Sequence, residues 1–159
     1  MKKFLPITLS IFILLSITSC TKDGTKPITV DYLIFGHFYG YCLGEKCIEI
    51  YKIVPMQLLE DTNDTYPKST TFYKATYISL SAQNYNDVKD LTLAFPQDLW
   101  DETNTVIGTP DAADGGGLYI ECSQNGKRRF WLLDQAKINV PSKYHSFIDQ
   151  VNAKIKLLP

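Results

Sequence analysis

The sequence has few of the residues that ordinarily build a catalytic centre. It contains two histidines, His37 and His145, and four cysteines among its 159 residues. No internal repeat is present, and no apolar run after Cys20 approaches the roughly 20 residues that span a bilayer. The glycine-rich residues 114–117 precede an expected strand and lack the lysine of a nucleotide-binding loop. These absences exclude a P-loop enzyme and make a closed zinc site dependent on distant ligands.

The amino-terminal segment has the form of a bacterial lipoprotein signal. A basic start, Met-Lys-Lys, is followed by residues 4–17, which are mostly apolar but too short for a stable transmembrane helix. The segment ends in Ile17-Thr18-Ser19-Cys20, which resembles the lipobox at which lipoprotein precursors are acylated and cleaved. We therefore expect residues 1–19 to be a signal peptide and Cys20 to carry lipid. The alternative is an ordinary secretory signal with an incidental cysteine.

Lipid on Cys20 would hold the chain at a membrane without a spanning helix. Each buried methylene of an acyl chain such as palmitate contributes about 0.8 kcal/mol, and stable anchoring takes more than one chain. Residues 20–27 are mostly polar, as expected for a flexible tether. Thr21 is not the aspartate that retains enteric lipoproteins in the inner membrane. We therefore expect a cell-envelope protein at the outer membrane, on its periplasmic or surface side.

The charge balance argues against nucleic acid as a partner. The chain has 16 basic and 17 acidic side chains, and loss of Lys2 and Lys3 with the signal leaves 14 against 17, a net charge of −3. Proteins that bind nucleic acid normally present a basic face. Asp111 and Asp114 lack the regular spacing of a calcium loop, so we expect no metal and no other cofactor.

Residues 28–159 are expected to form one globular domain that begins with strands. Residues 28–41 are rich in β-branched and aromatic side chains at both alternating positions, which predicts a first strand covered on both sides. After a four-residue loop at 43–46, residues 47–54 are expected to return as a second strand. Residues 70–80 are expected to form an extra strand.

The clearest predicted element is a hairpin over residues 118–133. Asn125-Gly126 is a strong signal for a type I′ turn between two strands. That turn places Cys122 opposite Arg129 and makes one face of the hairpin mostly apolar.

Helical periodicity occurs in residues 84–94, with Ser81 or Asn84 as candidate caps, and again after Pro141. The last helix is expected to bury a continuous apolar stripe made of Tyr144, Phe147, Ile148, Val151, Ile155 and Leu158. The whole order predicts an α+β fold: a single antiparallel sheet built from two hairpins plus an extra strand, with two main helices packed on one face.

Cys42 and Cys47 flank the first expected hairpin loop, which would place them opposite one another across the strands. In an oxidising envelope compartment such a pair is expected to form a disulfide. Two separate thiols, a redox role and a metal site remain open as alternatives. The spacing is neither the redox C-x-x-C nor a typical zinc pair.

Cys122 lies on the apolar face of its hairpin and is most simply a small buried hydrophobic residue. Its alternatives are a disulfide with Cys42 or Cys47, or a nucleophile. A nucleophile needs a base, and the spacing brings neither His37 nor His145 near. The second hypothesis for the function is nevertheless a thiol-dependent hydrolase or redox enzyme that uses Cys42, Cys47 or Cys122.

The segment most suggestive of binding is residues 35–41. Its rings could form a platform for a carbohydrate or a peptide, or they could fill the core. The candidate ligand-binding residues are Phe35, His37, Phe38, Tyr39 and Tyr41.

Residues 35–47, Phe-Gly-His-Phe-Tyr-Gly-Tyr-Cys-Leu-Gly-Glu-Lys-Cys, resemble a group of small uncharacterised lipoproteins of Gram-negative bacteria. The closing hairpin, Val140-Pro141 and residues 147–152 are similar to the same group. The resemblance implies lipidation and envelope localisation but no activity. We therefore expect a non-enzymatic binding or accessory module, with an envelope protein or a glycan as its partner; a purely structural subunit of a larger assembly is a third hypothesis.

Overall fold

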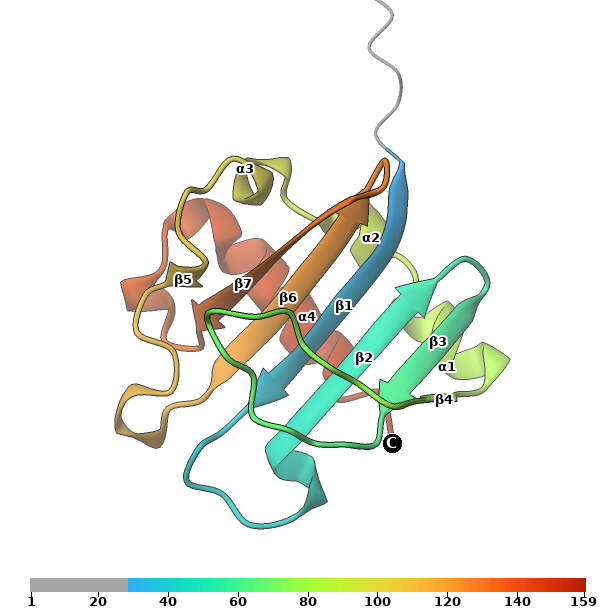
Figure 1. The fold of residues 1–159 in the computed structure, drawn as a ribbon, viewed down its shortest axis with the longest axis horizontal. Helices are drawn as coiled ribbons and strands as arrows, with labels where there is room; N and C mark the ends of the chain where they lie inside the picture. The colour runs from blue at the N-terminus through green and yellow to red at the C-terminus, as the bar shows by residue number, and fades with distance from the viewer. Residues whose placement is uncertain (1–28) are drawn as a thin grey trace, which may run out of the picture.

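The computed structural model describes residues 29–159, so the predicted signal peptide, Cys20 and the tether lie outside the described residues. Seven strands form a single sheet in the order β4-β3-β2-β1-β6-β7-β5 (Figure 1). The strands are β1 (Val30–Phe38), β2 (Ile48–Val54), β3 (Gln57–Asp61), β4 (Tyr77–Ser79), β5 (Val106–Ile107), β6 (Gly117–Gln124) and β7 (Lys127–Asp134). The helices are α1 (Ala82–Val88), α2 (Leu91–Ala94), α3 (Gln97–Trp100) and α4 (His145–Ile155). Short 3₁₀ turns occupy Glu45–Cys47, Ala112–Asp114, Lys137–Asn139 and Ser142–Tyr144.

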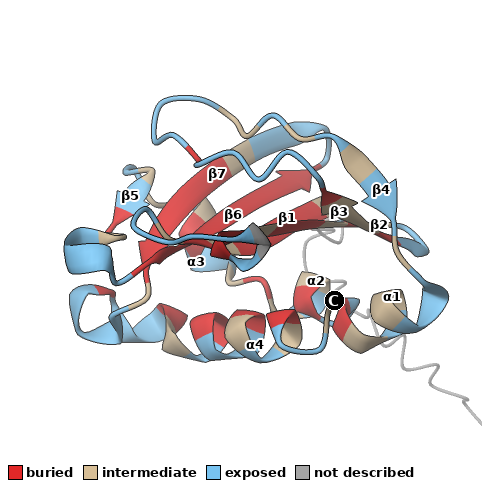
Figure 2. Cartoon of the chain, turned by 90° about the horizontal axis from the view of Figure 1, so that it is seen from below, coloured by how far each residue is buried: buried red, intermediate tan, exposed pale blue. Residues whose placement is uncertain are grey.

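The single sheet with its helices confirms the predicted α+β class, but the strand pairing differs from the prediction. β5 pairs parallel with β7, with Val106 opposite Leu132, so the sheet is mixed rather than purely antiparallel. The expected extra strand over 70–80 is reduced to β4, and β3 adds a strand between β4 and β2. The reason is that residues 62–76, here the crossing segment, leave the sheet and pass over one of its faces (Figures 1 and 2).

β1 is the central strand, and it is covered on both faces as its sequence predicted. It pairs antiparallel with β2 on one side and with β6 on the other. The consecutive side chains of Leu33, Ile34 and Phe35 are all buried, although successive residues of a strand point to opposite faces. A layer of protein must therefore lie on each side of this strand.

Helices form the first of these layers. α1, α2 and α4 lie together on one side of the sheet (Figure 2). Five residues of the predicted stripe are buried in α4 and the turn before it: Tyr144, Phe147, Ile148, Val151 and Ile155. The sixth, Leu158, is partly buried. Burial of each such side chain contributes about 1.5–3 kcal/mol, which makes this the main core of the domain.

The expected helix over 84–94 is divided into α1 and α2. Ser81 caps α1, and its Oγ accepts a hydrogen bond from the backbone N–H of Asn84 at 3.1 Å. Lys154 Nζ, from α4, donates to the carbonyl of Asp87 at 2.6 Å and lies 2.8 Å from the carboxylate of Asp90. This cation satisfies a carbonyl oxygen at the end of α1 and stabilises the break between the helices.

The two hairpins differ in how well local sequence predicted them. β6 and β7 pair with Cys122 opposite Arg129, as expected, and both turn residues have positive φ, 52° at Asn125 and 76° at Gly126. A type I′ turn needs these values, and glycine adopts them without strain. β1 and β2, in contrast, stop pairing at Phe38, so residues 39–47 form a longer loop than the four residues expected.

The crossing segment covers the second face of the sheet. Phe72 packs its ring against Phe130 of β7, with centroids 5.0 Å apart, and the guanidinium of Arg128 lies 3.7 Å from the centroid of Phe72. The backbone N–H of Tyr73 donates to the hydroxyl of Tyr119 at 3.1 Å. These contacts hold the crossing segment against the sheet without making it a strand.

A buried carboxylate organises the polar groups beneath the crossing segment. Glu121 of β6 is almost completely buried and accepts hydrogen bonds from the hydroxyls of Tyr32 at 2.7 Å and Tyr119 at 2.6 Å. Burial, together with the Glu121 carboxylate, raises the pKa of the Tyr119 hydroxyl, which therefore remains a donor. Such a buried acceptor is stable only because its oxygens are paired.

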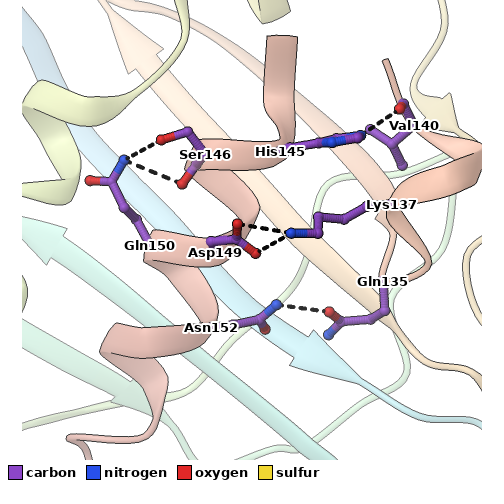
Figure 3. A network of polar contacts seen from close by, with 8 residues as sticks. All are labelled: Gln135, Lys137, Val140, His145, Ser146, Asp149, Gln150 and Asn152. Carbon is purple, nitrogen blue, oxygen red and sulfur yellow. Dashed lines mark hydrogen bonds and ion pairs between the residues drawn. The ribbon is translucent and has the colours of Figure 1, made fainter. Parts of the chain in front are cut away.

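The carboxyl end of β7 is tied to α4 by polar contacts on the surface (Figure 3). Lys137 Nζ lies 2.8 Å from Asp149 Oδ1, and Asn152 donates to Gln135 at 3.0 Å. His145 Nε2 lies 2.8 Å from the carbonyl oxygen of Val140. The ring of His145 therefore serves to fix the start of α4.

Candidate functional site

Three loops meet at the end of the sheet where β1 stops: residues 39–47, 62–68 and 108–116. We call them the distal loop cluster. The polypeptide that precedes Val30 joins the domain at the opposite end of β1 (Figure 1). A strand of this length, 9 residues, spans about 30 Å at roughly 3.3 Å per residue. The cluster is thus about 30 Å farther along β1 than Val30, the first residue of the strand.

Asp111 holds the distal loop cluster together. Its Oδ2 accepts hydrogen bonds from the backbone N–H of Gly40 at 2.8 Å and from the hydroxyl of Tyr66 at 2.9 Å. Its Oδ1 accepts from the backbone N–H of Gly116 at 3.1 Å. One carboxylate therefore connects all three loops, through hydrogen bonds to a charged acceptor, which are stronger than those between neutral groups.

Aromatic contacts add to this junction. Tyr66 packs edge-on against Phe38, with ring centroids 5.1 Å apart. Burial and the hydrogen bond to Asp111 raise the pKa of Tyr66 to about 12, so its hydroxyl stays protonated at neutral pH. The ring of Tyr39 lies against Gly116, where an added Cβ would come within 2.2 Å of Cε1 and where φ is 73°. Glycine is needed at this position for both reasons.

Cys42 and Cys47 are joined by a disulfide, with their Cα atoms 5.6 Å apart. They do not face one another across paired strands, as the sequence had suggested, because β1 and β2 have already separated. Cys42 is exposed at the loop and Cys47 is buried next to β2. The backbone N–H of Tyr39 donates to the carbonyl of Cys47 at 2.9 Å and closes the base of the loop.

The structure divides the predicted aromatic platform into buried and exposed parts. Phe35 and Phe38 are 0% and 1% exposed, which corrects their assignment as ligand-binding residues. They are buried because β1 is central and covered on both faces. His37 is half-buried, and its Nε2 lies 3.1 Å from the carbonyl oxygen of Lys46. Tyr39 is half-buried against Gly116, and Tyr41 is 86% exposed.

Two residues of the distal loop cluster, Leu43 and Tyr66, were not predicted from the sequence as site residues. Leu43 is fully exposed beside Tyr41, and a hollow lined by residues 40–43 lies at the tip of the loop. Tyr66 belongs to the mostly polar residues 62–69 of the crossing segment. An aromatic residue within a polar loop was the available signal for Tyr66, and an apolar residue between the cysteines was the signal for Leu43.

Cys122 is unsuited to nucleophilic chemistry. Its side chain is completely buried in the core beneath the helices, and burial raises the pKa of its thiol to about 12. A thiolate is the reactive form of cysteine, and it would be scarce at neutral pH. His37 and His145 each have a ring nitrogen within hydrogen-bond reach of a backbone carbonyl, of Lys46 and Val140 respectively.

Within residues 29–159, no group of three or more His, Cys, Asp or Glu side chains is arranged to hold a metal ion. Over the same range, none of the helices has the length and apolar character needed to cross a membrane. Comparison with family models, with curated proteins and with solved structures finds no match to this chain.

Proposed function

We propose that this protein is a lipid-anchored module of the bacterial cell envelope that docks a partner protein through its distal loop cluster. The observation that carries the proposal is the exposure of Tyr41 and Leu43 at the end of the domain opposite the tether. Large apolar side chains exposed next to one another mark interaction sites on soluble domains. The hollow beside them offers space for a side chain of the partner.

The loop that presents Tyr41 and Leu43 is held in place before any partner arrives. The Cys42–Cys47 disulfide restricts it from one side and the hydrogen bond from Gly40 to Asp111 restricts it from the other. Ordering a loop on association commonly costs about 0.5–1.5 kcal/mol for each immobilised side chain, and this restraint reduces that cost. Tyrosine is also among the residues that most often dominate binding energy at interfaces.

The proposed anchor joins the domain at the end opposite the distal loop cluster. With lipid on Cys20, the tether leads to Val30 at the near end of β1, and the distal loop cluster points away from the anchoring membrane. The lipobox and the resemblance to Gram-negative lipoproteins support the lipid anchor at Cys20. A surface that faces away from its own membrane is positioned to meet another envelope protein.

The anchoring half of the proposal is tested in cells that express the full chain. Metabolic labelling with a palmitate analogue should modify the wild-type protein and the C122A control, whereas C20A should carry no label and keep the mass of the uncleaved precursor. Label on C20A equal to that of the control would exclude lipidation at Cys20.

The docking half is tested with a photoreactive phenylalanine analogue at position 41. Illumination of whole cells should give a discrete adduct, which mass spectrometry then identifies. The matched control carries the same analogue at Leu93, which is equally exposed and lies on α2, outside the distal loop cluster. An adduct at both positions, or at neither, would contradict the proposal. With the purified partner, Y41A should weaken binding about tenfold or more while the circular dichroism spectrum stays unchanged.

A further inference from the structure

The crossing segment encloses a second hollow, separate from the tip of the distal loop cluster. Its volume is about 540 Å³, and it is lined from residue 63 to residue 74 by the two arms of the segment. Ligand sites for small molecules usually occupy about 300–1,000 Å³. The hollow therefore has room for a ligand of one or two sugar units.

The charge of this hollow has one sign. Lys68 and Lys74 both line the hollow. Among the described residues, no Asp or Glu side chain lines it. None of the ion pairs between residues 29–159 involves either lysine. The nearby acidic residue Asp64 lines a different hollow with Glu49 and Glu60. Two lysines without an acidic partner favour a ligand that carries a carboxylate or a phosphate.

The remaining lining suits a sugar. Tyr66 is 43% exposed and borders the hollow. The face of an aromatic ring is electron-rich and attracts the C–H groups on the apolar side of a sugar ring. Short hydrogen-bonding side chains surround it, and they can pair with sugar hydroxyls: Asn63, Thr65, Thr70 and Thr71.

The walls of the hollow are fixed by contacts on their far side. The hydroxyl of Tyr73 donates to Asp61 Oδ2 at 2.6 Å and accepts from the backbone N–H of Thr65 at 3.1 Å. The side-chain amide of Asn63 donates to the carbonyl of Lys74 at 3.4 Å, which joins the two arms. Phe72 and Tyr66 pack against the sheet, on Phe130 and Phe38. A ligand would therefore enter a formed site rather than order a free loop.

We propose that the hollow of the crossing segment binds an acidic saccharide of one or two sugar units. The sugar ring lies on Tyr66, and Lys68 and Lys74 bind its carboxylate or phosphate. This site does not depend on the proposed docking function, because Tyr41 and Leu43 take no part in it. The substitution Y41A should leave saccharide binding unchanged, which separates the two proposals.

The test measures binding to the full chain in detergent micelles by isothermal titration calorimetry. The probes are digalacturonic acid and glucose 6-phosphate, each with its neutral counterpart, digalactose and glucose, and inorganic phosphate as an anion without a sugar. We expect at least one acidic sugar to bind about tenfold more tightly than its neutral counterpart and than phosphate, since hydrogen bonds between a charged group and its partner are stronger than those between neutral groups.

Matched variants assign the binding to this hollow. K68Q and K74Q should each weaken the acidic sugar about tenfold, and Y66L should weaken the acidic and neutral sugars alike. K127Q and K156Q, which remove exposed lysines outside the hollow, should bind as the wild type does. Absence of saturable binding by both acidic probes, equal binding of inorganic phosphate, or equal effects of K74Q and K127Q would each overturn the proposal.

Discussion

Asp111 offers the sharpest test of how the distal loop cluster is held. The substitution D111A removes the acceptor for Gly40, Tyr66 and Gly116 in one step. Each hydrogen bond to a charged acceptor contributes about 1.5–3 kcal/mol, and the lower figure applies here because Asp111 is only half-buried. At about 1.5 kcal/mol for each of the three bonds, we expect the free energy of unfolding in urea to fall by about 4–5 kcal/mol.

Backbone strain must be separated from the loss of these hydrogen bonds. Asp111 has a φ of 63°, where alanine is disfavoured by about 1–2 kcal/mol. Asp114 lies in the same loop with a φ of 58°, and its exposed carboxylate takes no part in the junction around Asp111. D114A is therefore the matched control, which carries the strain without the lost contacts.

The substitution D111N gives a finer prediction, because asparagine tolerates the same backbone conformation. Its amide has a single acceptor oxygen, which will remain with the two donors on the Oδ2 side, Gly40 and Tyr66. The NH₂ group then faces the N–H of Gly116, and that contact is lost. Amide hydrogen exchange should become about tenfold faster at Gly116 and change little at Gly40.

The reasoning about Asp111 would be refuted by either of two results. One is a D111A protein that is no less stable than D114A, since only strain would then distinguish both from the wild type. The other is D111N with unchanged exchange at both glycine amides. In either case the three loops would have to be held by packing of Tyr39 and Tyr66 alone.

Three further predictions concern stability and reactivity. Replacing both Cys42 and Cys47 by serine should lower the free energy of unfolding by about 2 kcal/mol, as expected for a short closed loop, and an unchanged urea midpoint would show that the bridge does not restrain the chain. Cys122 should resist maleimide labelling in the native protein at neutral pH and react fully in urea; rapid native labelling would contradict its burial. The pKa of Asp134 lies below its ordinary value of 3.8 because, although burial raises it, hydrogen bonds from Asn139 and from the backbone of Ala136 and Thr109 lower it further. The Asp134 carboxylate therefore stabilises the fold fully above about pH 4, and this stabilisation is lost as the pH falls through the lowered pKa. D134N should flatten the acid limb of a curve of unfolding free energy against pH, and an unaltered limb would contradict this account.

Sequence alone determined the elements whose signals are local. Asn125-Gly126 defined the β6–β7 hairpin, and the register followed because turn chemistry and alternation act over a few residues. The apolar stripe after Pro141 predicted α4, and of the two candidate caps for the earlier helix, Ser81 and Asn84, the structure uses Ser81 as the N-cap. Aromatic and aliphatic residues at both alternating positions predicted that β1 is covered on two sides.

Tertiary structure alone decided what covers β1 and which residues meet beyond it. Residues 70–76 have the composition of a strand, but the free edge of β3 receives only β4. Phe72 and Tyr73 instead pack their rings against Phe130 and Tyr119 on the second face of the sheet. The hydrogen bonds of Asp111 to Gly40 and Tyr66 connect residues 71 and 45 positions apart. No local pattern encodes such contacts.

The predicted platform shows the same division. The chemistry of residues 35–41 was visible in the sequence, but only the fold sorted its rings, placing Phe35 and Phe38 in the core and leaving Tyr41 in solvent. The number and types of aromatic rings are properties of the sequence. Their exposure depends on where β1 ends and on which distant segments lie over it, and these are set by packing of the whole chain.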